Sequence, residues 1–186
     1  DINRIKKRDL RRNIAVVLQD VFLFSGDIKK NITLNNEMSD EHVNDALKAA
    51  CAYDFVYSLP GGIYEPVMER GSTFSAGQRQ LLSFARAIAH NPSIFVLDEA
   101  TANIDTHTEK LIQKAIENIT RDRTTLIIAH RLSTIRNADK IIVISKGKIV
   151  EMGKHEELMR LGGHYKRMID EGDRHGENPE YKVAAN

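Results

Sequence analysis

Two adjacent carboxylates follow a short apolar run near the middle of the chain. In the sequence IFVLDEAT, residues 94–97 lead directly into Asp98 and Glu99. Carboxylate oxygens can bind a divalent metal ion or take a proton from an attacking water, and a pair could divide these two roles. A strand that leaves the core into a solvated loop could end in the same way, so the pair gains meaning only if other strands end in matching chemistry.

Two further apolar runs also end in polar side chains. Residues 14–18 lead to Gln19, and residues 124–129 lead to His130. Ligands of open parallel sheets bind outside the carboxyl ends of the strands, so an amide, two acids and an imidazole could converge on one site. Taken singly, Gln19 or His130 could equally be a hydrogen-bonded structural residue. The presence of all four polar side chains at strand ends favours a common ligand-binding site.

The segment FSAGQRQ, residues 74–80, predicts the start of a helix. Ser75 and Gln78 have the spacing of a capping box, and the apolar residues of 81–89 recur at helical spacing up to an Asn-Pro pair. We expect Arg79 and Arg86 on the outward face. Unpaired N–H groups and the helix dipole at such an end favour an anion, although an ordinary capped helix has the same pattern.

The elements that must position these residues indicate an α/β domain with parallel strands, because short apolar runs alternate with helical patterns. Residues 39–59 are predicted to be helical from a start at Ser39. A helix over 106–120 has Thr106 and Glu109 at the spacing of a second capping box. Residues 155–171 are predicted to be helical on both sides of a Gly-Gly pair, and Lys146 and Gly147 to form the turn of a β-hairpin.

Composition excludes several classes. The 186 residues carry 27 Lys and Arg against 26 Asp and Glu, so neither the charge nor a basic stripe indicates nucleic acid as a partner. The single Cys51 cannot form an internal disulfide, and the seven histidines show no metal-site spacing. No apolar stretch reaches the roughly 18 to 20 residues of a membrane span. The polar tail, residues 172–186, is expected to be disordered.

Five motifs in order resemble those of ATP-binding cassette (ABC) ATPases. FSAGQRQ followed by IFVLDEAT is similar to their signature motif and Walker B strand. ANID, ending at Asp105, resembles the D-loop, His130 the switch histidine and Gln19 the Q-loop glutamine. The resemblance implies a P-loop NTPase (RecA-like) parallel-sheet core over residues 1–20 and 90–171, its N-terminal part missing, with an inserted helical subdomain at residues 21–89.

The resemblance also implies roles. Glu99 would act as general base or polarise the attacking water, His130 would contact the γ-phosphate of ATP, and Gln19 would sense metal and water. Asp98, with Gln19, would hold Mg²⁺. The residues implied to contact nucleotide are Ser75, Ala76, Gly77, Gln78 and Asp105. In the family these signature residues serve a nucleotide held by a second nucleotide-binding domain, so a homo- or heterodimer is expected.

The sequence departs from the family in one important respect. No Gly-x-x-x-x-Gly-Lys-[Ser/Thr] phosphate loop occurs in it. In the family this Walker A loop precedes the point at which this sequence begins, so we expect the chain to be the back portion of a nucleotide-binding domain that by itself is inactive. Ala76 and Phe74 replace a glycine and a leucine of the usual signature, but alanine keeps the backbone donors.

Residues 22–34 and 69–71 resemble exporter-type transport cassettes, in which these segments meet the coupling helices of the membrane domain. The favoured interpretation is the ATP-binding and hydrolysing part of an exporter-type ABC transporter, at the cytoplasmic face of a cell membrane, with a transmembrane domain as partner and no nucleic acid. Two alternatives stay open: a soluble ABC ATPase of DNA repair or translation, and a catalytically silent fragment.

Overall fold

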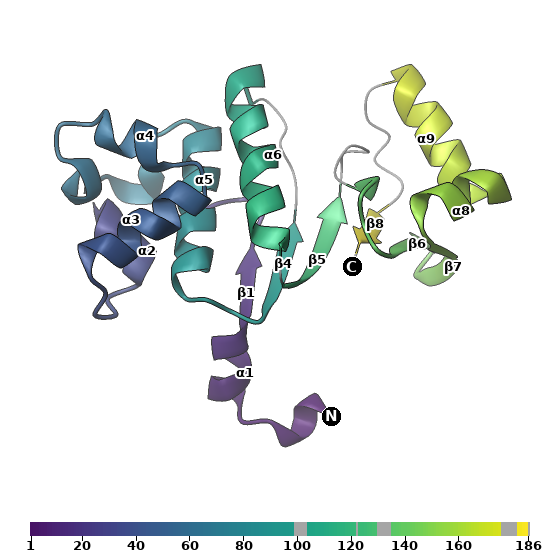
Figure 1. Cartoon of the computed structure of the whole chain (residues 1–186), viewed down its shortest axis with the longest axis horizontal. Helices are drawn as coiled ribbons and strands as arrows, with labels where there is room; N and C mark the ends of the chain where they lie inside the picture. The colour runs from purple at the N-terminus through teal and green to yellow at the C-terminus, as the bar shows by residue number, and fades with distance from the viewer. Residues whose placement is uncertain (99–103, 122, 130–134, 176–181, 186) are drawn as a thin grey trace. The chain divides into compact units, whose positions relative to one another are not determined.

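The computed structural model describes residues 1–98, 104–121, 123–129, 135–175 and 182–185 (Figure 1). The chain divides into two compact units, Asp1–Phe95 with Thr101–Arg123 and Val96–Ala100 with Thr124–Asn186. The boundaries of these units differ from those of the core and helical subdomain that the resemblance implies. The division into core and helical subdomain stays a prediction. No helix among the described residues is long and apolar enough to cross a membrane.

The first unit is mainly helical. Its helices are α1 (Lys7–Asn13), α2 (Ile28–Thr33), α3 (Asp40–Ala49), α4 (Tyr53–Tyr57), α5 (Ala76–Ala89) and α6 (Thr106–Thr120). The strand β1 (Ile14–Val17) ends one residue earlier than its apolar run predicts, and it neighbours β4 (Ile94–Asp98), which begins in this unit. Two short strands, β2 (Gly26–Asp27) and β3 (Pro66–Val67), form a separate antiparallel pair.

Helix α3 starts where its sequence predicts. The Ser39 hydroxyl accepts a hydrogen bond of 3.2 Å from the His42 N–H, and two acidic residues occupy the first turn. The predicted helix over residues 39–59 is interrupted, however, because Cys51 adopts a left-handed conformation with φ 54°. Two helices, α3 and α4, therefore replace one. The Cys51 thiol is half-buried, and burial raises its pKa.

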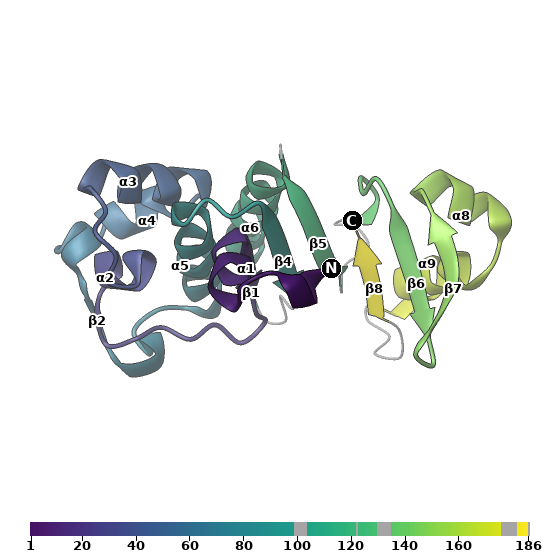
Figure 2. The same cartoon turned by 90° about the horizontal axis from the view of Figure 1, so that it is seen from below.

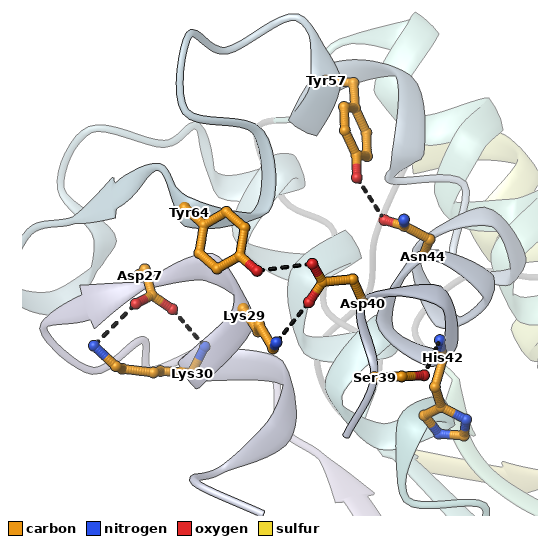
Figure 3. Close-up of polar contacts among 9 residues, drawn as sticks. All are labelled: Asp27, Lys29, Lys30, Ser39, Asp40, His42, Asn44, Tyr57 and Tyr64. Atoms are coloured by element: carbon orange, nitrogen blue, oxygen red, sulfur yellow. Dashed lines mark hydrogen bonds and ion pairs between the residues drawn. The ribbon is translucent and has the colours of Figure 1, made fainter. Parts of the chain in front are cut away.

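Polar contacts join the helices of this unit (Figure 3). Asp40 accepts from Lys29 Nζ at 2.5 Å and from the Tyr64 hydroxyl at 2.7 Å, which links α3 to α2 and to the 3-10 turn η2 (Gly62–Tyr64). The Tyr57 hydroxyl donates to Asn44 Oδ1 at 2.8 Å and thereby ties α4 to α3. These contacts are solvent-exposed, so we expect them to orient the helices more than to stabilise them.

Helix α5 forms the centre of the first unit. It contacts α2, α3 and α6, and nine of its fourteen residues are buried. Leu81, Leu82 and Phe84 are at most 2% exposed. Burial of such side chains contributes roughly 1.5 to 3 kcal/mol each, so the helix that carries Ser75 is fixed by the core along its length.

The second unit is built on a sheet. Hydrogen-bonded neighbours follow the order β4, β5 (Thr124–Ala129), β8 (Lys182–Ala185), β6 (Ile141–Ser145) and β7 (Lys148–Gly153). β4 and β5 run in the same direction (Figure 1), whereas β8 is antiparallel to β5 and to β6. The predicted hairpin is confirmed: Lys146 and Gly147, both with positive φ, form the turn between β6 and β7.

The second unit also contains α8 (His155–Leu161) and α9 (His164–His175), which lie next to β6 and β7 in both views (Figures 1 and 2). Gly162, with φ 68°, ends α8 as the predicted Gly-Gly break requires. The Glu151 carboxylate of β7 accepts from the backbone N–H of His164 and, at 2.9 Å, from that of Tyr165. Residues 182–185, in the tail for which we expected disorder, form β8.

Candidate functional site

The start of α5 has the capping geometry that its sequence predicts. The Ser75 hydroxyl accepts from the Gln78 N–H at 3.2 Å, and Gln78 Oε1 accepts from the Ser75 N–H at 2.9 Å. Ser75 and Ala76 are exposed. Within the described residues, no hydrogen bond is made by the N–H groups of Ala76 and Gly77, so the first turn keeps donors for an anion.

Gly77 has a packing role that the sequence does not reveal. It is buried, and a Cβ atom added there would overlap Cγ2 of Thr108 and lie 3.3 Å from Cγ2 of Ile104. Only glycine therefore lets the first turn of α5 approach the first turn of α6 so closely. The two helix N-termini are held side by side.

The start of α6 differs from its prediction. Asp105, not Thr106, is the N-cap, because its carboxylate accepts from the N–H groups of His107 at 3.1 Å and Thr108 at 3.0 Å. The capping box expected for Thr106 and Glu109 is therefore wrong. Hydrogen bonds to the Asp105 carboxylate lower its pKa, those from Thr108 more than the one from His107. This residue of the D-loop sequence thus has a structural role beside its predicted contact with nucleotide.

The residues predicted to handle metal and water lie in different parts of the chain. Gln19 is exposed just beyond β1 in the first unit, and Asp98 is the half-buried last residue of β4 in the second. Glu99 and His130 lie outside the described residues, as do Ala102 and Asn103 of the ANID segment. The convergence of these side chains at one site stays a prediction.

The described residues are compatible with Mg²⁺ but not with a metal site made by protein alone. Among them, no three His, Cys, Asp or Glu residues gather where they could hold a metal ion. Mg²⁺ typically takes only one or two carboxylates and completes its shell with phosphate oxygens and water, so a single strand-end Asp98 is a suitable donor.

Arg86 organises the segment that follows β1, which contradicts its expected outward position. Its Nε donates to the Asn31 carbonyl at 2.8 Å, its Nη1 to the Phe22 carbonyl at 3.0 Å, and its Nη2 to Asn31 Oδ1 at 3.1 Å. Burial lowers the pKa of Arg86. Arg79 is half-buried as well and donates to the Phe74 carbonyl at 2.6 Å.

Asn31 completes this arrangement. It is 2% exposed, and its Nδ2 donates to the carbonyls of Phe24 at 2.8 Å and Asp27 at 3.0 Å. Its Oδ1 accepts from the Phe24 N–H at 2.8 Å in addition to Arg86. The Asn31 amide therefore donates two hydrogen bonds through Nδ2 and accepts two through Oδ1. It thereby fixes a segment that has no regular secondary structure.

An apolar cavity lies beside this segment, wholly within the first unit. Its volume is about 700 Å³, and its lining includes Val16, Leu18, Phe22, Phe24 and Arg86. The rings of Phe22 and Phe24 meet edge to face with centroids 5.0 Å apart, yet they remain 48% and 53% exposed. The two exposed rings lie in the segment 22–34 that the sequence singled out, and exposed apolar side chains that adjoin a cavity are typical of binding surfaces.

Comparisons with known proteins agree with these observations. The model of the ABC transporter family matches residues 1–102. YheH of Bacillus subtilis, a probable multidrug resistance ABC transporter ATP-binding/permease protein, is 52% identical over 177 residues, 94% of this chain and 26% of that protein. The ATP-dependent lipid A-core flippase of Francisella tularensis is 44% identical over 174 residues, 92% of this chain and 29% of the flippase.

A solved structure has the same fold. The bacterial Atm1-family ABC exporter with ATP bound is 37% identical, with a TM-score of 0.85 over 93% of this chain and 31% of the exporter. The predicted α/β class is thereby confirmed. The chain spans between a quarter and a third of the length of the proteins it matches. Since the family match covers more than half of the chain, including α5 and β4, the chain belongs to the ABC transporter family.

Proposed function

We propose that this chain is the ATP-binding and ATP-hydrolysing part of an exporter-type ABC transporter and drives substrate transport through dimerisation around nucleotide. The observation that carries the proposal is the exposed start of α5, where Ser75 caps the helix and unbonded N–H groups remain in its first turn. Such an end binds phosphate through its donors and its dipole. The exporter relatives support the transport assignment.

The first turn of α5 would stabilise negative charge on the phosphates. The N–H groups of Ala76 and Gly77 would donate to phosphate oxygens, while Ser75 and Gln78 hold them in position through the capping box. Because Gly77 packs on Thr108, the same contact would pass any movement of α5 to α6 and Asp105. In a sandwich dimer the nucleotide itself would be held by the partner domain.

The residues at the strand ends would bind the metal ion, activate the attacking water and contact the terminal phosphate. Asp98 and Gln19 would hold Mg²⁺, which when bound neutralises charge on the phosphates. Glu99 would accept a proton from the attacking water or polarise it, and His130 would donate to the terminal phosphate. Each of these residues mainly positions groups and stabilises charge, as phosphoryl transfer requires.

The cavity beside β1 supports a membrane-domain partner. Phe22 and Phe24 are exposed and held in place by Asn31 and Arg86, so they offer a prepared apolar surface for a coupling helix of the transmembrane domain. This partner would place the chain at the cytoplasmic face of the membrane. A second nucleotide-binding domain, identical or different, would complete the ATP site.

The 186-residue chain by itself is proposed to bind ATP weakly and not to hydrolyse it, because its sequence has no phosphate loop. Titration of the chain with fluorescent ATP and Mg²⁺ tests this. Micromolar affinity would contradict the proposal for the isolated chain.

The decisive test for the intact transporter is Glu99→Gln. We expect ATP binding to persist while steady-state hydrolysis falls by about two orders of magnitude or more, because the glutamine amide cannot take the proton. Glu117→Gln, an exposed change on α6, is the control and should leave hydrolysis unchanged. Normal turnover in Glu99→Gln would remove Glu99 from its role. Stimulation of the intact protein by DNA or RNA would favour the alternative of a soluble ATPase.

A further inference from the structure

Three tyrosine side chains form a row beside helix α3, within the first unit. The Tyr64 hydroxyl donates to Asp40 Oδ2 at 2.7 Å, and the Tyr57 hydroxyl donates to Asn44 Oδ1 at 2.8 Å (Figure 3). Positions 40 and 44 are one helical turn apart, so these contacts are spaced by about 6 Å along the helix axis. The rings of Tyr53 and Tyr57 are in contact, with centroids 4.5 Å apart. We call these three residues the tyrosine row.

The rings of the tyrosine row are held in position but are not covered. Tyr57 is 45% exposed and Tyr64 is 56% exposed, although the hydroxyl of each is bonded to α3. A side chain that is already anchored loses little conformational freedom when a partner contacts it. Tyrosine is also enriched at protein interfaces, where it supplies a large, rigid contact area. The row therefore has the properties of a docking surface.

The rings of the row bind cations within this chain. Lys29 Nζ lies 5.7 Å from the centroid of the Tyr64 ring, and Lys48 Nζ lies 5.5 Å from that of Tyr53. In the part of the chain that the structure describes, no cation lies over the ring of Tyr57. Tyr57 is therefore the ring that a cation from outside the chain can contact.

The charge around the row is negative. Residues 37–65 carry six acidic side chains against the single basic Lys48. The side chain of Asp45 is 67% exposed, and that of Asp40 is 49% exposed. Hydrogen bonds from Lys29 and then Tyr64 lower the pKa of Asp40, so this carboxylate stays ionised. A surface of this sign repels nucleic acid and anionic lipid and attracts a cationic segment.

We propose that the tyrosine row is a docking site for an arginine-rich segment of a partner protein, with one guanidinium stacked on Tyr57 and others paired with exposed carboxylates of α3. Arginine is favoured over lysine because its planar, weakly hydrated guanidinium stacks on aromatic rings and pairs with a carboxylate through two hydrogen bonds. None of the three tyrosines lines the cavity beside β1 or belongs to the start of α5, so the site goes beyond the proposed function.

Amide chemical shifts of the 186-residue chain, measured by NMR during peptide titration, test the site. The probe is acetyl-Ser-Arg-Ser-Arg-Thr-Arg-Ser-amide, and acetyl-Ser-Lys-Ser-Lys-Thr-Lys-Ser-amide is a control of equal charge. The arginine probe should shift the amides of α3 and α4 saturably and bind about threefold or more tighter than the lysine probe. Raising the salt from about 50 mM to about 500 mM should weaken both. Equal affinities, or shifts spread over other acidic surfaces, would overturn the proposal.

Variants in the row separate stacking from charge. Tyr57→Leu should reduce the affinity for the arginine probe to that for the lysine probe, whereas Tyr57→Phe keeps the ring and should stay within about twofold of the unmodified chain. Asp45→Asn should weaken both probes alike. Unshifted amides in α5 show that each variant is folded. An unchanged affinity in Tyr57→Leu would refute the stacked arginine.

A second copy of this chain is the alternative occupant, because residues 1–13 carry six Lys and Arg against two Asp and are almost all exposed. Sedimentation of the chain at rising concentration distinguishes the two. We expect no association that depends on the row. Association that Tyr57→Leu abolishes would make another copy the occupant and overturn the assignment to a separate partner. ATP takes part in none of these measurements, so a negative result would not bear on the proposed ATPase.

Discussion

Gly77 of α5 lies against Thr108 of α6 so closely that a Cβ atom at position 77 would overlap the Thr108 methyl group. The two residues are far apart in sequence, yet they hold together the N-terminal turns of two helices. The Thr108 N–H also donates to the carboxylate of Asp105, the N-cap of α6, so Thr108 takes part both in the cap of α6 and in its contact with α5.

We predict that Gly77→Ala destabilises the chain by about 1 to 3 kcal/mol, because a β-branched threonine in a helix has little freedom to move its methyl group. Urea denaturation of the 186-residue chain measures the change.

Thr108→Ser is the matched partner of this variant, because it removes only the overlapping methyl group and keeps the hydroxyl. Combined with Gly77→Ala, it should restore much of the lost stability, while alone it should have a small effect. Purely additive losses in the double variant would show that the overlap is not the cause.

Replacing Ser75 should separate helix capping from anion binding. Ser75→Ala removes the cap and should cost about 0.5 to 2 kcal/mol, whereas Ser75→Asp keeps a capping oxygen and should retain stability. In the intact transporter, however, Ser75→Asp places a negative charge where phosphate is expected, so ATP hydrolysis should fall sharply.

Ser39→Asp is the control, since Ser39 caps α3 in the same way and is not a predicted nucleotide contact. It should change neither stability nor hydrolysis appreciably. Equal hydrolysis by the unmodified transporter, Ser75→Asp and Ser39→Asp would argue against an anion site at the start of α5.

Arg86→Lys should loosen the aromatic segment beside the cavity. One ammonium group cannot replace three guanidinium donors directed at Asn31 and Phe22, so we expect a loss of about 1 to 3 kcal/mol and faster amide exchange at residues 22–24. Arg121→Lys, an exposed change, should stay within about 0.5 kcal/mol. Unaltered exchange at residues 22–24 would show that Arg86 does not organise this segment.

The cap of α6 should weaken in acid. Hydrogen bonds from Thr108 and His107 lower the pKa of Asp105 below its unfolded value of about 3.9. The stabilisation is therefore complete above the unfolded pKa and is lost as the pH falls through the lower folded pKa. Asp105→Asn keeps the cap without titrating.

The difference in Tm between the native chain and Asp105→Asn should accordingly be constant from pH 7 to about pH 5. Below about pH 4 the Tm of the native chain should fall relative to that of Asp105→Asn. Thermal unfolding followed by circular dichroism over this range measures it. A difference that is constant down to pH 2.5 would mean that Asp105 titrates normally.

Local chemistry made several elements predictable from the sequence. Ser75 with Gln78, Ser39 with its acidic first turn, and the Lys146–Gly147 turn specify their structures through neighbouring residues, and each prediction is confirmed. The start of α6 was misplaced by one residue, because Asp105 and Thr106 are both good caps and only the fold chooses between them.

What the sequence could not predict depends on distant contacts. The outward position assigned to Arg86 followed helical periodicity, which does not show that the carbonyls of Phe22 and Asn31 lie within its reach. The need for glycine at position 77 depends likewise on Thr108. The roles of Glu99 and His130 remain predictions from their motifs, and the domain division remains one too.

The fully bonded amide of Asn31 has a consequence for recognition. The Asn31 side chain pairs with both the N–H and the carbonyl of Phe24, as the backbone of a neighbouring strand would, and thereby holds the loop in one conformation. Two aromatic rings are thereby displayed to solvent on a rigid support. Because this segment is already ordered, docking on the two rings would cost it little conformational entropy.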